Sequence, residues 1–398
     1  MQALEGKHIL LGVSGGIAGY KSVELVRRLR DAGALVRVVM TPGAEAFVQP
    51  LSFQAVSGEP VRTVLLDPGA EAAMGHIELA RWADAVLIAP ASADVIARLS
   101  QGLAGDLLAT LYLATDAPVA IAPAMNRVMW QHPATRRNVA TLLRDGVQVF
   151  GPAEGSQACG EVGPGRMLEP PQLVTALTGM LSPSVLQGRR VLVTAGPTRE
   201  PLDPVRYLSN HSSGRMGFAI AAAAALAGAE VLLVAGPCAL DTPFGVDRVD
   251  VVTAVEMEQA VMAHVAGQDI FISTAAVADY RPITVATHKI KKQQPGLTIE
   301  LARNPDILAA VAALPDAPFT VGFAAETQDL LTEARRKRDA KGIDMIAANL
   351  VGVPGLGFDV ADNQLDVLVG DACHRLGPGA KTRLADELIA LIARSLPA

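Results

Sequence analysis

Two apolar runs of this chain each lead into a short turn of glycine and small polar residues that could bind a phosphate. The first run leads into Ser14, Gly15 and Gly16, and the second, 190–195, leads into Gly196. A strand followed by a tight turn and a helix start can hold a phosphate through backbone N–H groups. A plain tight turn explains the glycines equally well, and neither turn has the glycine spacing of a dinucleotide-binding fingerprint.

Other segments of the first half join polar side chains to loop residues: His76–Asp84, Ala89–Asp94, Pro123–Trp130 and Ala158–Arg166. The last three follow apolar runs, and ligands bind at the carboxyl ends of parallel strands. Taken singly, each has an ordinary structural interpretation, because most lone histidines are structural and most isolated cysteines are inert small hydrophobes. Cys159 differs from Cys238 and Cys373, since it lies in a loop rich in glycine and proline.

The second half has its own polar and basic segments: 196–217, 273–280, 289–292, 304–308, 322–327 and 335–342. Lys337 and Lys341 are four residues apart and share a helix face, for which contact with solvent is the default interpretation. Two basic clusters beside Asp279, at the end of an apolar run, also fit a polyphosphate with Mg²⁺, which takes few carboxylates and several phosphate oxygens. No Walker A motif is present, so the chain is not a P-loop enzyme.

Alternating apolar runs and helical patterns must position these groups. The expected strands lie near 8–13, 35–40, 85–89, 118–122 and 147–150 in the first half, and near 191–195, 230–235, 269–274, 319–323 and 343–347 in the second. This alternation predicts an α/β protein with two tandem domains, each a mostly parallel sheet with helices on both faces. A short linker, Ser182–Gly188, gives expected domains of 1–188 and 189–398.

Composition narrows the class of protein. The chain has 398 residues, of which 19% are charged and 50% hydrophobic, so a disordered chain is excluded. A net charge of −6 argues against a general nucleic-acid binder. Three separated cysteines leave no zinc ribbon or disulfide framework. No secretory signal and no apolar run of about 18 residues is apparent, so we expect a cytoplasmic protein that does not cross a membrane.

Roughly the first 180 residues resemble the flavin-dependent cysteine decarboxylase family. Four features of that family occur here in order, at Ser14–Ala18, His76, Pro123–Trp130 and Ala158–Arg166. The resemblance implies a flavodoxin-like, Rossmann-like domain that binds FMN. It also implies oxidation of a substrate thiol to a thioaldehyde, loss of CO₂ and reduction of the resulting enethiolate, with the electron chemistry supplied by the cofactor.

The same resemblance assigns roles to particular residues. Cys159 would donate the proton in the reductive half, and Asn126 would hydrogen-bond the substrate carboxylate. His76 would assist thiol oxidation, either as a base or by orienting the substrate. The family has trimeric flavin domains with the site at a subunit contact. The residues expected to line the FMN site are Ser14, Gly15, Gly16 and Ser92.

From about residue 190 to the end, the chain resembles phosphopantothenate–cysteine ligase. Its markers are Ala-Gly-Pro-Thr-Arg-Glu, Asn-x-Ser-Ser-Gly-x-Met-Gly, Ala-Ala-Val-Ala-Asp-Tyr, Lys-x-Lys-Lys and Gly-Phe-Ala-Ala-Glu-Thr. The resemblance implies that the 4′-phosphopantothenate carboxylate attacks the α-phosphate of CTP, and that cysteine then attacks the acyl-cytidylate. Such catalysis is mostly alignment and charge neutralisation.

Residue roles in the second half follow from the same motifs. Lys289 would stabilise charge on the phosphates, Asn210 would hold the acyl intermediate with Arg206 as a weaker candidate, and Asp279 would bind Mg²⁺. The family forms dimers of this domain, and it usually has aspartate where this chain has Leu350. The expected CTP contacts are Ser273, Thr274, Ala275, Asp279, Lys289, Pro305, Asp306, Ile307, Leu308, Phe323, Lys337 and Lys341.

Together the two resemblances predict a homo-oligomeric enzyme that catalyses two successive steps of coenzyme A synthesis. The alternatives are a peptidyl-cysteine decarboxylase whose second half only binds a ligand, a non-catalytic partner of a phosphatase, and an NAD-dependent dehydrogenase. The intact Lys289, Asp279 and Lys337 argue against the first, and Cys159 argues against the second. The missing dinucleotide fingerprint argues against the third.

Overall fold

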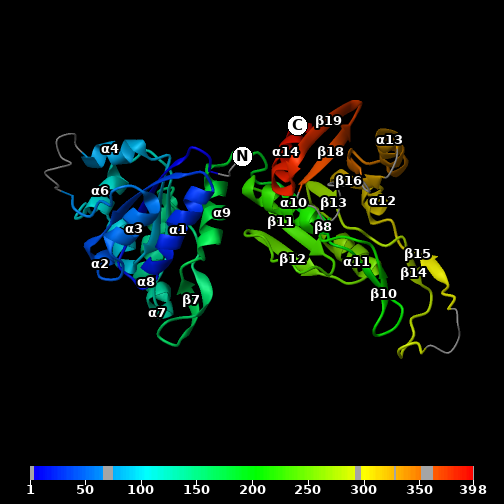
Figure 1. Cartoon of the computed structure of the whole chain (residues 1–398), viewed down its shortest axis with the longest axis horizontal. Helices are drawn as coiled ribbons and strands as arrows, with labels where there is room; N and C mark the ends of the chain where they lie inside the picture. The colour runs from blue at the N-terminus through cyan, green and yellow to red at the C-terminus, as the bar shows by residue number, and fades with distance from the viewer. Residues whose placement is uncertain (1–3, 66–74, 292–296, 327–328, 351–361, 398) are drawn as a thin grey trace. The chain divides into compact units, whose positions relative to one another are not determined.

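A computed structural model describes residues 4–65, 75–291, 297–326, 329–350 and 362–397, and it divides into two compact units, Met1–Ser182 and Pro183–Ala398 (Figure 1). The division falls at the start of the expected linker. Leu186, inside that linker, is fully buried in the core of the second unit. Its backbone N–H donates to the Ala227 carbonyl at 2.9 Å, so the later linker residues are part of the second unit.

The first unit is built on a parallel sheet with the strand order β2-β1-β3-β4-β5. Its strands are β1 (His8–Val13), β2 (Leu35–Met40), β3 (Ala85–Ala91), β4 (Val119–Pro123) and β5 (Gln148–Val149). Successive side chains of β1 pack on opposite faces of the sheet, as the pleat of a strand requires. Leu11 thus packs into one apolar cluster and Leu10 into another.

Helices cover both faces of this sheet (Figure 1). One face carries α1 (Gly19–Asp31), α2 (Pro42–Glu45), α3 (Pro50–Ser57) and α9 (Pro170–Leu181). The other face carries α4 (Gly75–Trp82), α5 (Ala93–Ser100), α6 (Leu107–Ala114) and α8 (Pro133–Arg144). The strand order reverses between β1 and β3, which is where such sheets open a crevice at their carboxyl ends.

An antiparallel hairpin and a short helix stand beside that crevice. The hairpin consists of β6 (Ala153–Ser156) and β7 (Val162–Arg166), and α7 (Arg127–Gln131) follows β4. Backbone bonding ties the two together, because the Met125 N–H donates to the Gly165 carbonyl at 2.9 Å. Gly165 has a φ of +142°, and a Cβ there would collide with the Met125 carbonyl oxygen, so only glycine permits this approach.

The second unit has a larger sheet with the order β12-β11-β8-β13-β16-β17-β18-β19. The strands are β8 (Arg190–Ala195), β11 (Glu230–Ala235), β12 (Val246–Asp250), β13 (Ile270–Ser273), β16 (Phe319–Glu326), β17 (Met345–Leu350), β18 (Asp362–Val369) and β19 (Ala372–Ala380). Pairs from β12 to β17 are parallel, whereas β18 and β19 are antiparallel. The order reverses between β8 and β13, where a second crevice is expected.

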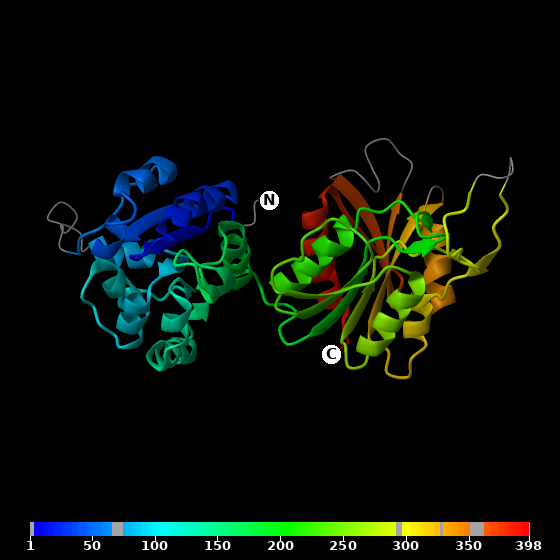
Figure 2. The ribbon, with the colours of Figure 1, turned by 90° about the horizontal axis from the view of Figure 1, so that it is seen from below.

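Helices again cover both faces of the sheet (Figure 2). One face carries α10 (Arg215–Leu226) and α14 (Lys381–Ser395), and the other carries α11 (Ala254–His264), α12 (Ile307–Ala312) and α13 (Leu330–Lys341). The alanine-rich helix α10 packs closely on β8 and α14 because its side chains are small. Within the described residues, no helix is both long and apolar enough to cross a membrane.

Two small antiparallel pairs extend from the second sheet. They are β9 (Arg199–Pro201) with β10 (Tyr207–Ser209), and β14 (Tyr280–Pro282) with β15 (Leu301–Arg303). In Figures 1 and 2 the yellow segment that contains β14 and β15 projects away from the sheet.

The predicted fold class is confirmed: two tandem α/β units each hold a mostly parallel sheet with helices on both faces. The ten predicted strands all occur as strands of the two sheets. The strand β12, the hairpin β6–β7, the small pairs and β18–β19 were not predicted. Most of their sequences, such as Val-Gly-Pro-Gly-Arg in β7, lack the apolar runs of buried strands because they lie at an edge or outside the sheets. The exception is β18, an inner strand with buried Leu365, Val367 and Leu368, which sequence reasoning missed.

Truncation of Leu186 to alanine should destabilise the second unit by about 2–5 kcal/mol, because it leaves a cavity in a packed core. Val185, which is 50% exposed, is the matched control and should change stability by no more than about 0.5 kcal/mol when replaced by alanine. Hydrogen exchange of the β8 amides measures the second unit. Both tryptophans, Trp82 and Trp130, lie in the first unit, so their fluorescence in urea should stay unchanged. An equal loss of stability in both units would contradict the placement of Leu186 in the core of the second unit.

Candidate functional sites

A cavity of about 530 Å³ opens in the first unit at the crevice between β1 and β3. It is lined by the turn after β1, the loop after β3, the loop after β4 and the turn of the β6–β7 hairpin. The carboxyl ends of neighbouring parallel strands therefore meet the hairpin around one hollow. Its position at the strand ends and its mixed polar and apolar lining suit a partly apolar ligand that also carries polar groups.

The turn after β1 requires glycine for a steric reason. A Cβ on Gly15 would lie 2.8 Å from the carbonyl oxygen of Gly43, in the short helix α2. A Cβ on Gly16 would meet nothing within 4 Å, so this position is open. Gly16 lies just before α1, a 13-residue helix whose first N–H groups can bind an anion.

Ser14, which was predicted to line the FMN site, is placed differently from the neighbouring Gly15 and Gly16. Its side chain is buried, and its Oγ donates to the Pro90 carbonyl at 2.8 Å and accepts from the Ser92 N–H at 2.9 Å. It thereby joins the turn after β1 to the loop after β3. Gly15, Gly16 and Ser92 line the cavity, whereas Ser14 is absent from the described residues that do so.

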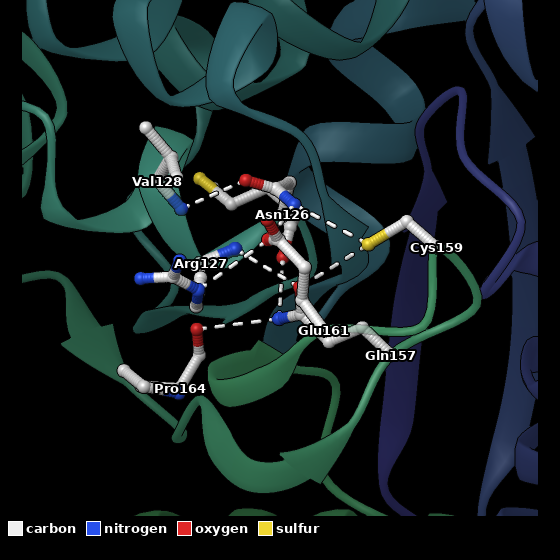
Figure 3. A network of polar contacts seen from close by, with 8 residues as sticks. Asn126, Arg127, Val128, Gln157, Cys159, Glu161 and Pro164 are labelled. Carbon is white, nitrogen blue, oxygen red and sulfur yellow. Dashed lines mark hydrogen bonds and ion pairs between the residues drawn. The ribbon is translucent and has the colours of Figure 1, made fainter.

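The predicted thiol and amide of the first unit meet at the cavity. The Nδ2 of Asn126 lies 3.4 Å from the Sγ of Cys159, and both residues line the hollow (Figure 3). Asn126 is the N-cap of α7, and Cys159 lies exposed in the hairpin turn. Gln157 joins the two loops, since its Nε2 lies near the Met125 carbonyl at 3.4 Å and its Oε1 accepts from the Arg127 N–H at 3.0 Å.

His76 is not among the described residues around this cavity. It is half-buried on α4, which packs against α6 on one face of the sheet. The tertiary structure of a single chain thus brings Asn126 and Cys159 together without His76.

Two basic residues beside the cavity were missed as individual candidates. Lys21, on α1, and Arg166, at the end of β7, both line the cavity. Each pairs with Glu169, at 2.6 Å and 3.2 Å respectively. A signal was available for Lys21, because it occupies the first turn of the helix that follows the Ser-Gly-Gly segment.

The second unit has two adjoining cavities of about 490 and 640 Å³ at the end of β13. They share Ala275, Val277, Asp279 and Phe323, so ligand groups in both would meet along the segment 275–279. The first cavity reaches the start of α10 and includes Asn210 and Asn349. The second includes Ser273 and the segment Pro305–Leu308, all of which were predicted to contact CTP.

Two threonines near β8 hold the segment that separates these cavities. Thr194 accepts from the Thr274 hydroxyl through its carbonyl at 2.5 Å, and Thr198 Oγ1 accepts from the Ala278 N–H at 3.0 Å. Asn304 donates its side-chain N–H to the Ala278 carbonyl at 2.7 Å. The shared wall is therefore anchored on both sides.

The predicted basic residues are spread over several elements. Lys341, at the end of α13, lines the second cavity and pairs with Asp306, the N-cap of α12, at 2.8 Å. Lys289 is exposed and Lys337 half-buried, and neither is among the described residues that line the two cavities. Of the predicted motifs, Lys292 and Thr327 lie outside the described residues, as does the side chain of Leu350.

An ion pair between a buried carboxylate and a partly exposed guanidinium anchors the segment that carries Lys289. Asp203 is fully buried at its side chain and accepts from the Arg206 guanidinium at 2.6 Å and from the Ile290 N–H at 3.1 Å. Arg206 in turn donates to the Ile290 carbonyl at 2.8 Å. Arg206, the weaker candidate for the acyl pocket, thus binds the backbone of the residue next to Lys289. It is not among the described residues that line either cavity.

This environment perturbs Asp203. The Arg206 hydrogen bond holds the pKa of the Asp203 carboxyl well below its usual range, against the opposing effect of burial and with the help of backbone N–H groups. Sequence reasoning missed Asp203. Its only local signal is the spacing of Asp203 and Arg206 across one turn.

The carboxylates of the second unit limit how a metal could bind. Among the described residues, no group of three or more His, Cys, Asp or Glu side chains could hold a metal ion. Asp279 offers one exposed carboxylate at the wall shared by the two cavities. This donor set fits Mg²⁺ only where phosphate oxygens and water complete the octahedron.

Comparison with known proteins covers both units. The flavoprotein family matches residues 1–182, and the DNA/pantothenate metabolism flavoprotein C-terminal domain matches residues 186–396. The coenzyme A biosynthesis bifunctional protein CoaBC of Vibrio cholerae is 58% identical over 395 residues, which are 98% of this chain and 99% of the relative. The chain belongs to the CoaBC family. It is therefore a bifunctional enzyme of coenzyme A biosynthesis, as its two resemblances predicted.

Other members of the CoaBC family match similarly. The Escherichia coli protein of that name is 59% identical over 392 residues, which are 97% of this chain and 96% of the relative. The solved C-terminal domain of a CoaBC protein is 40% identical, with a TM-score of 0.46, and covers 53% of this chain and 97% of its own.

Asp203→Asn should loosen the segment next to Lys289, because the amide offers one oxygen where the carboxylate offers two. We expect the Ile290 N–H to exchange with solvent about tenfold faster or more. Exchange measured by mass spectrometry on 286–291 checks this, with the exposed Asp247→Asn as the control. Unchanged exchange in Asp203→Asn would contradict the anchoring role.

The same variant has a pH signature. The pKa of Asp203 is lowered on folding, so its contribution to stability is present above its unfolded pKa of about 3.9 and is lost as pH falls through its folded pKa. The stability difference between the natural chain and Asp203→Asn should be constant above about pH 5 and should shrink at lower pH. Denaturation of the second unit at several pH values measures it. A difference that grows in acid would refute the assignment.

Proposed function

We propose that the second unit joins 4′-phosphopantothenate to cysteine with CTP, and that the first unit decarboxylates the product to 4′-phosphopantetheine with FMN. The observation that carries the decarboxylase half of this proposal is the meeting of the Asn126 amide and the Cys159 thiol, 3.4 Å apart, in a cavity at the β1–β3 crevice. An amide N–H donor suits a carboxylate, and a thiol suits proton donation to carbon. Membership of the CoaBC family supports the pairing of the two activities.

In the first unit, the residues of this chain would bind, orient and protonate. FMN, when bound, supplies the oxidation of the substrate thiol and the later reduction. The open Gly16 turn and the start of α1 would hold the cofactor phosphate through N–H groups, with Lys21 nearby. Asn126 would hold the substrate carboxylate until it leaves as CO₂. The Cys159 thiol would then give its proton to the carbon skeleton.

In the second unit, the two adjoining cavities would hold the two reactants. The cavity with Pro305–Leu308 and Lys341 would hold CTP, and Asp279 would orient Mg²⁺ on its phosphates. The neighbouring cavity would hold the acyl group, because Asn210 lies there with its Nδ2 3.0 Å from the Val277 carbonyl. Lys289 would approach the reacting phosphate from its anchored segment and neutralise charge in the transition state.

The position of His76 supports a flavin site that two copies of the chain build together. It does not line the cavity of its own chain among the described residues, although the family resemblance gives it a part in thiol oxidation. We therefore propose that His76 of one copy completes the cavity of another, in a homo-oligomer. Trimeric flavin units and dimeric ligase units would both be compatible with cyclic symmetry.

The two activities should separate by mutation. With 4′-phosphopantothenate, cysteine, CTP and Mg²⁺, the natural chain should release pyrophosphate and CO₂. Lys289→Gln should abolish pyrophosphate release but still decarboxylate supplied 4′-phosphopantothenoylcysteine. Cys159→Ser should keep pyrophosphate release and give CO₂ without 4′-phosphopantetheine, because the final proton is missing.

Pyrophosphate release tests the ligase assignment, and CO₂ release tests the decarboxylase assignment. Pyrophosphate without CO₂ in the natural chain would refute the decarboxylase assignment. Decarboxylation of cysteine peptides without pyrophosphate would instead favour a peptidyl-cysteine decarboxylase whose second unit only binds a ligand. Normal turnover by Cys159→Ser would refute its role as proton donor.

Complementation tests the shared site. His76→Asn and Cys159→Ser should each fail to form 4′-phosphopantetheine alone. Co-expressed, they should regain it at about a quarter of the sites, where each copy supplies the intact residue that the other lacks. No recovery in verified mixed oligomers would place both residues in one chain's site or deny His76 a role.

A further inference from the structure

Both the oxygen and the nitrogen of the Asn126 carboxamide have hydrogen-bond partners. Its Oδ1 accepts from the Val128 N–H at 2.8 Å, in the first turn of α7 (Figure 3). Its Nδ2 lies 2.7 Å from Glu161 Oε2 and 3.4 Å from Cys159 Sγ. A side-chain amide has two N–H groups, so these two acceptors account for both. The orientation of the amide, with nitrogen toward the hairpin, is therefore determined.

The two acceptors differ in strength and in place. Glu161 offers a carboxylate at short range, and hydrogen bonds to charged groups are about twice as strong as neutral ones. Sulfur is a weak acceptor. Cys159 lines the cavity, whereas Glu161 is not among the described residues that do so. A carboxylate that enters the cavity would replace the weak sulfur contact and leave the Glu161 bond in place.

Arg127 compensates the charge of Glu161. Its Nε lies 3.4 Å from Glu161 Oε2, and both side chains are 39% exposed. Without this partner, Glu161 would repel a second carboxylate bound to the same amide. The pair thus holds Asn126 firmly while limiting repulsion of the substrate.

We propose that Glu161 is a positioning residue for decarboxylation. It fixes the Asn126 amide so that the remaining N–H faces the substrate carboxylate beside Cys159. This inference rests on the proposed role of Asn126 as the group that binds that carboxylate.

Glu161→Ala tests the inference in the full-length, FMN-loaded chain. Its kcat/KM for supplied 4′-phosphopantothenoylcysteine should fall about tenfold to a hundredfold, the value of a hydrogen bond to a charged group. Its affinity for 4′-phosphopantetheine, which lacks the carboxylate, should stay unchanged. Glu161→Gln should lie between, because its Oε1 can accept the same bond without charge.

Two controls separate positioning from damage. Glu154→Ala changes an exposed carboxylate on β6 of the same hairpin and should match the natural chain. Ligase activity of the second unit in the same sample measures the amount of folded chain. Wild-type or higher kcat/KM in Glu161→Ala, or equal weakening of both ligands, would overturn the inference.

A double-mutant cycle shows whether Glu161 acts through Asn126. In an Asn126→Ala background, Glu161→Ala should have no further effect on kcat/KM. Independent, multiplied losses would overturn the inference while leaving the proposed function intact. Normal decarboxylation by Asn126→Ala itself would refute the proposed role of Asn126, and the role of Glu161 with it.

Discussion

Each unit depends on one topological constraint: the strand order of a parallel sheet reverses beside its first strand. The loops that leave β1 and β3 must then turn to opposite faces, and so must those that leave β8 and β13. No helix can fill the gap at the carboxyl ends between such strands. The cavities of both units lie at these points, which is why glycine turns and helix starts meet polar loops there.

Around this common plan, the two units differ in how they position the residues that the sequence predicts for their sites. The first unit uses a hairpin outside the sheet, which brings Cys159 to Asn126 across the crevice. Its precision comes from backbone proximity at Gly165 and from the side chains of Gln157 and Glu161. The second unit holds the segment 275–279 by hydrogen bonds from threonines in and beside β8. It holds the Lys289 segment by the ion pair of Asp203 and Arg206.

Ion pairs have distinct tasks in the two units. The Asp203 carboxylate is buried although the Arg206 guanidinium is partly exposed, and both groups bond to the backbone of Ile290. Removal of Arg206 would leave a buried carboxylate without its charged partner. The pair of Arg127 and Glu161 is partly exposed and contributes little to stability by itself. The Glu161 carboxylate of this pair instead holds the side-chain amide of Asn126 in place. A net charge of −6 is compatible with local cationic groups such as Lys21, Arg166 and Lys341, which line the cavities.

The sequence by itself determined the α/β class, the two tandem units and ten of the strands, because most of these strands are buried on both faces and burial demands apolar runs. Its motifs also singled out Asn126, Cys159, Asp279 and the 305–308 segment, all of which line the cavities. It could not predict the β6–β7 hairpin, the strands β12, β18 and β19, or the partners that Ser14, Asp203 and Glu161 find elsewhere in the chain. Only tertiary structure decided that Ser14 joins two loops rather than lining the cavity, that His76 lies away from it, and that Arg206 binds Asp203. The reason is physical: hydrophobic periodicity records which face of an element is buried, whereas a polar contact depends on which loops the finished sheet brings within about 3 Å of each other.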